Sequence, residues 1–344
     1  MRSYHFDFVL NPGFVRPASM LCLALSLSHY AFTQTSGTLI AVNQADADIS
    51  IVDARAAKEV ARVPEGAVAG HEVAASLDGK TAYVPIYGDS SVGEAGTDGR
   101  ELLAIDLASR KVVGRLDFGH GVRPHSIIMN PKDGLLYVTT EVDRTVTIVD
   151  PKTFKIVGAI PTGQDQSHML VISHDGRFGY TANVGPGTVS VLDLNARKLV
   201  RVVKVSGTVQ RISITPDDRT VFTADQASPR LAAIDTATNT VKNWVSLPAV
   251  AYGTASTRDG RWLLVSLPND YKVAVVDLKT LQVTRTIPVP KGPHTVLMSP
   301  DNETAYVACM KSGQVAVINL ADWSVKGLIK VGNNADGIGW ASSH

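Results

Sequence analysis

The sequence predicts an all-β protein made of seven similar units, and three observations support this prediction. A short apolar strand that ends in aspartate or asparagine recurs seven times along the chain. From Asp193 onward the recurrence has a constant spacing of 42 residues. No helical period persists anywhere in the chain. Repeats of this length, built from strands alone, predict a seven-bladed β-propeller with four antiparallel strands in each blade. The residues that end the recurring strand are Asp53, Asp106, Asp150, Asp193, Asp235, Asp277 and Asn319.

The third repeat illustrates the strands expected in every unit. Residues 125–131, 135–140, 145–150 and 155–160 are rich in Val, Ile, Tyr and Thr, and turn residues separate them. Asp133-Gly134 falls at the first turn, where a positive φ favours glycine. Asp150 ends the third strand, and its carboxylate is expected to accept hydrogen bonds from turn backbone N–H groups. We therefore expect the recurring aspartates to be structural and not catalytic.

The two ends of the repeat region are complementary. Residues 38–63 contain the second, third and fourth strands of a blade, and residues 336–342 contain a first strand without partners. Pairing these segments would close the ring and remove the exposed edges of a linear array. The sequence therefore predicts one propeller domain, residues 37–344, closed by its C-terminal strand.

Residues 1–36 differ from the repeats. Arg2 and Arg16 precede an apolar stretch from Met20 to Leu27, and small or polar residues follow. This order is typical of a secretory signal, and the apolar stretch is shorter than the roughly 20 residues of a membrane span. We expect a leader in residues 1–36 and a mature protein that is periplasmic or secreted, without a membrane span. Cys309 is the one cysteine outside the leader, so no internal disulfide is expected.

Charge and motifs narrow the classes of function. The net charge is +1 without a run of Lys or Arg, which argues against a nucleic-acid partner. The chain has no glycine-rich phosphate loop, no Gly-x-Ser-x-Gly, no His-Glu-x-x-His and no Cys-x-x-Cys. Any chemistry must therefore come from residues that the fold brings together. We expect a monomer whose partner is a small-molecule substrate or ligand.

A second column, in phase with the strands, is rich in histidine. It consists of His71, His125, His168, Gln210, Tyr252, His294 and Asp336. An in-phase column places equivalent side chains around one axis, at the start of the innermost strands. The four histidines, with the neighbouring carboxylate, are donors that suit copper, zinc or iron, so we predict a divalent transition-metal site. The alternative is that each imidazole only bonds backbone at a blade-to-blade crossover.

Other residues of the same face are predicted to serve the site. The expected catalytic residues are Glu141, Asp336 and Tyr252, and the expected substrate-binding residues are Tyr87, Arg123, Gln210 and Lys291. Glu141 lies in a loop on the histidine face and is the expected general base. Arg123 and Lys291 are cations that would hold an anionic substrate. Glu72 directly follows His71, so strand alternation predicts that it points away from the site.

Two further features bear on the site. The loop over residues 87–100 is longer than its counterparts and rich in glycine, as expected for a lid or specificity loop beside the histidines. It could equally be a tolerated surface insertion, since long loops cost little free energy.

Cys309 and Met310 are soft donors that would favour copper if they turned inward.

Short motifs resemble those of a known family. Tyr137-Val138-Thr139-Thr140 is close to the motif of the YVTN-type β-propeller repeat family, and Tyr83-Val84 and Tyr306-Val307 are similar to its first half. The resemblance covers about residues 38–344 and implies a seven-bladed propeller. Similar propellers include lactonases of the 6-phosphogluconolactonase type and copper enzymes with the metal on the axis. Some family members bind single-stranded nucleic acid, which the near-neutral charge argues against.

Two functions from different classes remain at this point. The first is an exported metal-dependent enzyme that acts on a small molecule in the axial pocket, by lactone hydrolysis or by copper or iron oxidation. The second is a non-catalytic propeller that binds a ligand or a partner. Metal content distinguishes them, because only the first requires an ion bound by the histidines.

Overall fold

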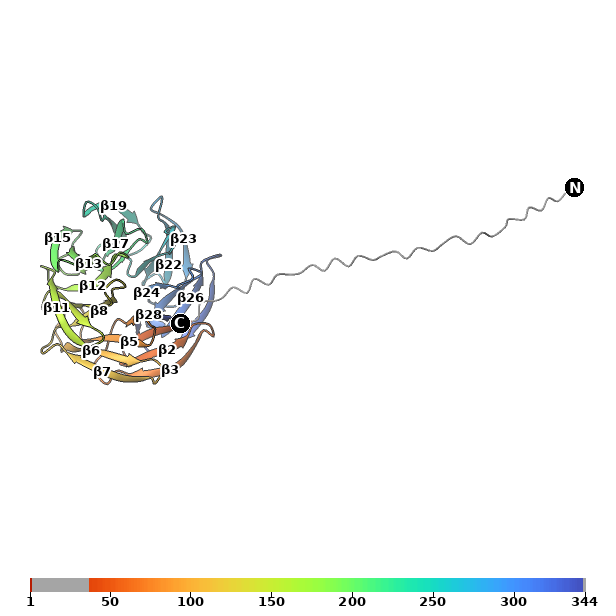
Figure 1. Ribbon diagram of the computed structural model, residues 1–344. Coiled ribbons are helices and arrows are strands. Elements are labelled where there is room, and N and C mark those ends of the chain that lie inside the picture. Colours follow the sequence, from red (N-terminus) through yellow and green to blue (C-terminus); the bar gives the residue numbers. More distant parts are fainter. Residues whose placement is uncertain (2–36, 343–344) are drawn as a thin grey trace, which may run out of the picture. The chain divides into compact units, whose positions relative to one another are not determined.

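The computed structural model describes residue 1 and residues 37–342 of the chain. The described residues form seven four-stranded antiparallel sheets around a ring, which confirms the predicted seven-bladed propeller (Figure 1). The predicted leader lies outside the described residues except for its first residue. Among the described residues, the single helical element is a 3-10 turn, η1 (Met310–Ser312). None of them forms a helix with the length and apolarity that a membrane span needs.

The strands of each blade run from the axis to the circumference. Blade 1 contains β28 (Ala335–Ser342), β1 (Gly37–Asn43), β2 (Asp48–Asp53) and β3 (Lys58–Pro64). Blade 2 contains β4 (Ala74–Ala75), β5 (Thr81–Gly88), β6 (Asp98–Asp106) and β7 (Lys111–Asp117). Blade 3 contains β8 (Pro124–Met129), β9 (Leu136–Thr140), β10 (Thr145–Asp150) and β11 (Lys155–Pro161). Blade 4 contains β12 (Ser167–Ile172), β13 (Phe178–Asn183), β14 (Thr188–Asp193) and β15 (Lys198–Lys204). Blade 5 contains β16 (Val209–Ile214), β17 (Thr220–Asp225), β18 (Arg230–Asp235) and β19 (Thr240–Ser246). Blade 6 contains β20 (Thr254–Ser256), β21 (Trp262–Leu267), β22 (Lys272–Asp277) and β23 (Gln282–Pro288). Blade 7 contains β24 (Pro293–Met298), β25 (Thr304–Cys309), β26 (Gln314–Asn319) and β27 (Val325–Lys330).

The ring is closed as the sequence predicts. Strand β28 pairs antiparallel with β1, with Thr38 opposite Ala341 and Ile40 opposite Gly339. The last strand therefore supplies the innermost strand of blade 1. Because every blade then has four strands, the ring has no unpaired end of the kind that a linear array would expose.

The core lies between neighbouring blades. The middle strands of the blades are buried along almost their whole length, for example Leu136–Thr140 in β9. Burial on both faces explains why these strands are continuous apolar runs in the sequence. Cys309 is buried in the core that includes residues of blades 6 and 7, so its thiol belongs to the packing between these blades.

The recurring aspartates have the structural role predicted for them. Asp53 accepts hydrogen bonds from the backbone N–H groups of Arg55 and Ala56, each at 2.9 Å. Asp277 accepts them from Lys279 and Thr280 at 2.8 and 2.9 Å. Each carboxylate satisfies backbone donors of the turn that follows its strand, which is why this residue type recurs.

One buried carboxyl makes the stability of the fold depend on pH. Glu65 is fully buried after β3, and one side-chain oxygen accepts a hydrogen bond from the backbone N–H of Gly70 at 2.7 Å. The other oxygen, Oε1, has no hydrogen-bond partner among the described residues. Burial raises the pKa of Glu65 from 4.5 to about 7. Between these values the folded state binds a proton that the unfolded state has lost, so this group lowers stability as the pH rises from 4.5 to 7.

We expect Glu65→Gln to raise the free energy of unfolding by roughly 1–3 kcal/mol at pH 8, because the variant no longer buries a charge. At pH 4.5 the variant and the wild type should differ little, since the wild-type carboxyl is then protonated. Denaturant unfolding at both pH values measures this, with the exposed Glu303→Gln as control. A difference that is the same at both pH values would show that Glu65 does not titrate in this range.

Candidate active site

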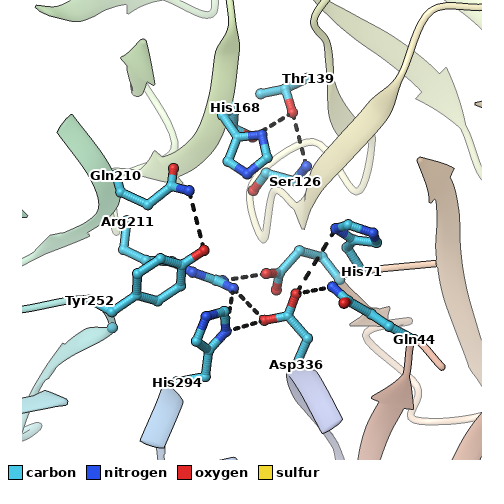
Figure 2. Close-up of polar contacts among 12 residues, drawn as sticks. Gln44, His71, Ser126, Thr139, His168, Gln210, Arg211, Tyr252, His294 and Asp336 are labelled. Atoms are coloured by element: carbon cyan, nitrogen blue, oxygen red, sulfur yellow. Dashed lines mark hydrogen bonds and ion pairs between the residues drawn. The ribbon is translucent and has the colours of Figure 1, made fainter. Parts of the chain in front are cut away.

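The histidine-rich column converges on one cavity. The cavity has a volume of about 360 Å³ and lies among the innermost strands. All seven residues of the column line it, namely His71, His125, His168, Gln210, Tyr252, His294 and Asp336. Tyr87, Gln44, Ser91, Val92, Val184 and Met310 complete the lining of this axial cavity. Figure 2 shows part of this lining with Arg211, namely Gln44, His71, His168, Gln210, Tyr252, His294 and Asp336, which approach from different blades.

Arg211 lies at the centre of the site and was not anticipated from the sequence. It belongs to β16 and is only 4% exposed. Its guanidinium forms ion pairs with Glu72 of blade 2 and with Asp336 of blade 1, the latter at 2.6 Å. The register of β16 shifts between Gln210 and Ile212, and a bulge of this kind re-aims successive side chains. A lone charged residue in an otherwise uncharged inner strand was the sequence signal that could have revealed Arg211.

The expectation that Glu72 points away from the site is wrong. Glu72 is buried and bonded to Arg211. Residues 71–73 precede β4 and are not in a regular strand, so alternation does not apply to them. Burial raises the pKa of Glu72 to about 7 even though Arg211 opposes this shift.

Asp336 is held as a carboxylate. Burial alone would raise its pKa, but the charges of His294 and Arg211 hold the pKa of Asp336 well below its usual range. The carboxylate also bonds to Nδ1 of His294 and accepts a hydrogen bond from the side-chain amide of Gln44. Because Asp336 binds a proton so weakly, it is better suited to orient His294 than to act as a base.

Tyr252 lies beside His294 and is set up as a hydrogen-bond donor. Their rings stack with centroids 3.8 Å apart, and the guanidinium carbon of Arg211 lies 4.9 Å from the centre of the Tyr252 ring. The amide of Gln210 donates a hydrogen bond to the Tyr252 hydroxyl at 3.2 Å. Burial raises the pKa of Tyr252 to about 12, so the hydroxyl stays protonated at neutral pH.

The other side of the cavity holds three imidazoles in contact. The ring centroids of His71 and His125 are 5.3 Å apart, and those of His125 and His168 are 3.5 Å apart. Burial lowers the pKa of His71 to about 4 and that of His125 well below its usual value, so both rings are neutral at neutral pH. Nδ1 of His125 is buried and has no hydrogen-bond partner among the described residues.

His168 is fixed by a carboxylate. Its Nδ1 bonds to Oε1 of Glu141, and the hydroxyl of Tyr87 donates to Oε2 of the same carboxylate at 2.9 Å. Both the His168 and the Glu141 side chains are 4% exposed. Because a carboxylate accepts hydrogen bonds, Nδ1 of His168 carries the hydrogen and Nε2 is the basic nitrogen.

The predicted set of four metal-binding histidines is not assembled, and Arg211 explains part of this outcome. The guanidinium lies 3.4 Å from Nδ1 of His294 and pairs with Asp336, so a second cation on that side is disfavoured. His125 and His168 are tilted by 31° and lie almost face to face, so their nitrogens do not converge on one point. Within residues 37–342, no group of three or more His, Cys, Asp or Glu residues is placed to hold a metal ion. In donor chemistry, His71, His125 and His168 still suit a transition metal.

The two cations expected to bind an anionic substrate do not reach the cavity. Arg123 forms an ion pair with Asp98 and donates a hydrogen bond to the backbone carbonyl of Glu94 at 2.8 Å. Its guanidinium carbon is 5.8 Å from the centre of the Tyr87 ring. Arg123 therefore fastens the 87–100 loop, while Lys291 is exposed and is not among the described residues that line the axial cavity.

The 87–100 loop lies over the histidine face, as the sequence predicts. Ser91 and Val92 line the axial cavity directly. The next part of the loop lines a smaller pocket of about 260 Å³, which we call the rim pocket. The rim pocket is lined by Gly93, Glu94, Asp98, Arg123, Glu141, Val142, Arg144, Asp165 and Gln166. The predicted site residues Glu141 and Arg123 thus line the rim pocket, and Met310 is the predicted soft donor that faces the axial cavity.

A larger cavity, of about 730 Å³, lies between blades 5 and 6, away from the histidines. Blades 4 and 5 are joined by a hydrogen bond from the backbone N–H of His174 to Asp218 at 2.9 Å. Between blades 5 and 6, the repeat places Pro216 at the position of His174 and Gly260 at the position of Asp218. Pro216 has no backbone N–H to donate, and Gly260 has no side chain to accept a hydrogen bond. The missing hydrogen bond between these blades accounts for the larger cavity without a role in function. We therefore place the candidate site at the axial cavity, where the histidines converge.

Comparisons with known proteins support a propeller with diverse relatives. A family model described as the cytochrome D1 heme domain matches residues 129–250. The chain is 32% identical to 6-phosphogluconolactonase of Bacillus subtilis (strain 168) over 92 residues, which cover 24% of this chain and 26% of that protein. The chain therefore spans about a quarter of the length of this relative.

Two solved structures are similar over most of the chain. Hydrazine synthase of Kuenenia stuttgartiensis has a TM-score of 0.69 and 21% identity, covering 83% of this chain and 92% of that chain. A functionally unknown protein from Desulfotomaculum acetoxidans DSM 771 has a TM-score of 0.73 and 17% identity, covering 90% of this chain and 99% of that chain. At these identities the likeness shows the shared fold alone.

We expect Arg211→Met to lower the free energy of unfolding by about 3–5 kcal/mol at pH 8, because it leaves two buried carboxylates without their cation. At about pH 5 the loss should be smaller, since Glu72 is then protonated in the folded state. The double variant Arg211→Met/Glu72→Gln should recover part of the loss at pH 8. Denaturant unfolding measures all three, and the exposed Arg201→Met is the control. Equal losses at both pH values without recovery would indicate that Arg211 stabilises through packing alone.

Proposed function

We propose that this protein is a hydrolase that acts on a small uncharged lactone or ester in the axial cavity. The observation that supports this most is the pair of buried histidine–carboxylate units beside one cavity, His168 with Glu141 and His294 with Asp336. A volume of about 360 Å³ is in the range of small-molecule sites. An uncharged substrate is favoured because Arg123 and Lys291 do not reach the cavity and Arg211 is already paired with two carboxylates.

His168 is the general base in this proposal. Glu141 fixes the tautomer with hydrogen on Nδ1, which leaves Nε2 to take a proton from a water molecule. The water oxygen then attacks the carbonyl carbon of the ester. When the carbon–oxygen bond of the ester breaks, Nε2 returns its proton to the leaving oxygen.

Tyr252 is the proposed donor to the oxyanion. Gln210 donates to the oxygen of Tyr252, so the hydroxyl hydrogen is free to point into the cavity. Negative charge that develops on the carbonyl oxygen would be stabilised by this donor. The stacking of Tyr252 on His294, which Asp336 holds in turn, fixes the direction of the hydroxyl.

The distant likeness to 6-phosphogluconolactonase, whose name describes a lactone hydrolase, supports the same reaction class. We also propose that the chain belongs to the YVTN-type branch of propellers, on the motif Tyr137-Val138-Thr139-Thr140. Most of the lactonase lies outside the match, so the substrate itself is proposed from the cavity and not from the relative.

Proton release from a panel of uncharged γ- and δ-lactones tests this function. We expect wild-type turnover of at least one lactone, a drop in kcat of about 10²–10⁴-fold for His168→Gln and a drop of about 10²-fold for Tyr252→Phe. The control is His174→Gln, at an exposed turn, which should keep the wild-type rate. Absence of turnover in the wild type, or an unchanged rate in His168→Gln, would contradict the proposal.

A second candidate is an enzyme with a metal or haem-type cofactor. It is favoured by the unpartnered Nδ1 of the buried His125, between the rings of His71 and His168, and by the match to a heme-domain family model. As they stand, the nitrogens of these three histidines do not meet at one point, so the rings would have to turn to hold the metal, with Glu141 orienting His168 from behind. A bound metal would supply Lewis-acid or redox chemistry.

Elemental analysis by mass spectrometry, with a visible spectrum for haem, tests this candidate. The purified protein is analysed as isolated and after reconstitution with copper, zinc and iron. The cofactor candidate predicts about one equivalent of metal, which His125→Gln loses while its circular dichroism is unchanged and which His174→Gln retains. No metal in any sample contradicts it. If lactone turnover is also absent, the non-catalytic binding propeller is the better account.

A further inference from the structure

Two separate cavities meet at the Glu141 side chain. His168 and Tyr87 line the axial cavity, whereas Glu141 lines the rim pocket. Within residues 37–342, these two cavities share no lining residue. The bonds from His168 and Tyr87 to Glu141 therefore cross the wall between the cavities.

The hydrogen bonds that cross this wall are shielded from solvent on the side of the axial cavity. The Glu141 carboxylate is almost fully buried, and both of its oxygens have a partner from the axial side. Ser91 and Val92 of the 87–100 loop cover the axial cavity, and Arg123 fastens this loop through Glu94. A proton bound to His168 thus has a short bonded route outward through Glu141.

The rim pocket is suited to hold water. Its Arg123 is paired with Asp98, and its Arg144 with Asp165 at 2.6 Å, so its walls are polar and both of its arginines are paired. Polar walls and a volume of about 260 Å³ allow several water molecules, which can accept a proton and exchange it with bulk solvent.

We propose that the rim pocket is the proton outlet of the axial site and that Glu141 is the relay residue in its wall. This rests on the proposed function for the source of the proton, which is the carboxylic acid formed by hydrolysis. Nε2 of His168 takes the product proton, Nδ1 gives its own proton to Oε1 of Glu141, and Glu141 gives it to water in the rim pocket. The product leaves as a carboxylate. His168 then carries hydrogen on Nε2, and the resting tautomer returns when water fills the cavity after product release.

The relay can be measured without any substrate. In the full chain labelled with ¹⁵N-histidine, the solvent-exchange rate of the His168 Nδ1–H is followed by NMR while phosphate, a proton acceptor, is added. We expect the rate to rise with phosphate in the wild type. We expect Glu141→Gln to slow exchange at least tenfold and to abolish the phosphate dependence. The amide oxygen of Gln still accepts the hydrogen bond, so a purely positioning role for Glu141 would leave the rate unchanged.

Two further variants complete the test. Asp143→Asn removes an exposed carboxylate two residues along the same loop and should exchange like the wild type. Val142→Trp keeps Glu141, but its larger side chain fills the rim pocket from a half-exposed position in the wall. This variant should also slow the exchange of the His168 Nδ1–H. If Glu141→Gln does not fold, Val142→Trp alone tests the proposal. Wild-type exchange in Val142→Trp and Glu141→Gln would show that protons leave through the axial cavity and would overturn the proposal. Because no lactone is involved, a failure of the hydrolase proposal does not affect this result.

Discussion

The ion pairs of Arg211 constrain the rest of the site. A guanidinium that is 4% exposed is costly to bury unless its charge is matched, and Glu72 and Asp336 match it from two other blades. Asp336 is the second residue of β28, the strand that closes the ring against β1. The strand that closes the ring therefore also carries a carboxylate of the site. A propeller whose C-terminal strand was displaced would lose its central ion pair as well as a strand of blade 1.

The residues that line the cavity have different environments near Arg211 and farther from it. Near Arg211 lie Asp336, His294 and Tyr252, where the guanidinium disfavours a further cation and the carboxylate stays ionised. The rings of His71 and His125 are neutral because burial lowers their pKa values, and Nδ1 of His71 lies 4.0 Å from a carboxylate oxygen of Asp336. Separate environments for titratable groups are what an acid–base site requires, because they allow one imidazole to act while another is held fixed.

The sequence predicted the fold and the column more reliably than the chemistry, for identifiable reasons. Repeat spacing fixes which residues are equivalent, so it predicted that β28 closes onto β1 and that the seven residues of the column meet at one cavity. Side-chain direction does not follow where regular strand geometry fails. The bulge in β16 and the irregular backbone before β4 turned Arg211 and Glu72 toward the axis, which alternation could not indicate. Without that guanidinium, four histidines in register resembled a single metal site.

The 87–100 loop connects these features. Its first residue, Tyr87, donates to Glu141, and its later residues are fastened by Arg123 and line both cavities. Tyr87 lies near the end of β5, so the strand that leads into the loop also supplies a hydrogen bond to the carboxylate that orients His168. The start of the loop and the orientation of His168 are thus connected through the Glu141 side chain. The burial of Tyr87 at the start of a loop that is long only in blade 2 fits this contact, because the tyrosine hydroxyl must reach the buried Glu141 carboxylate.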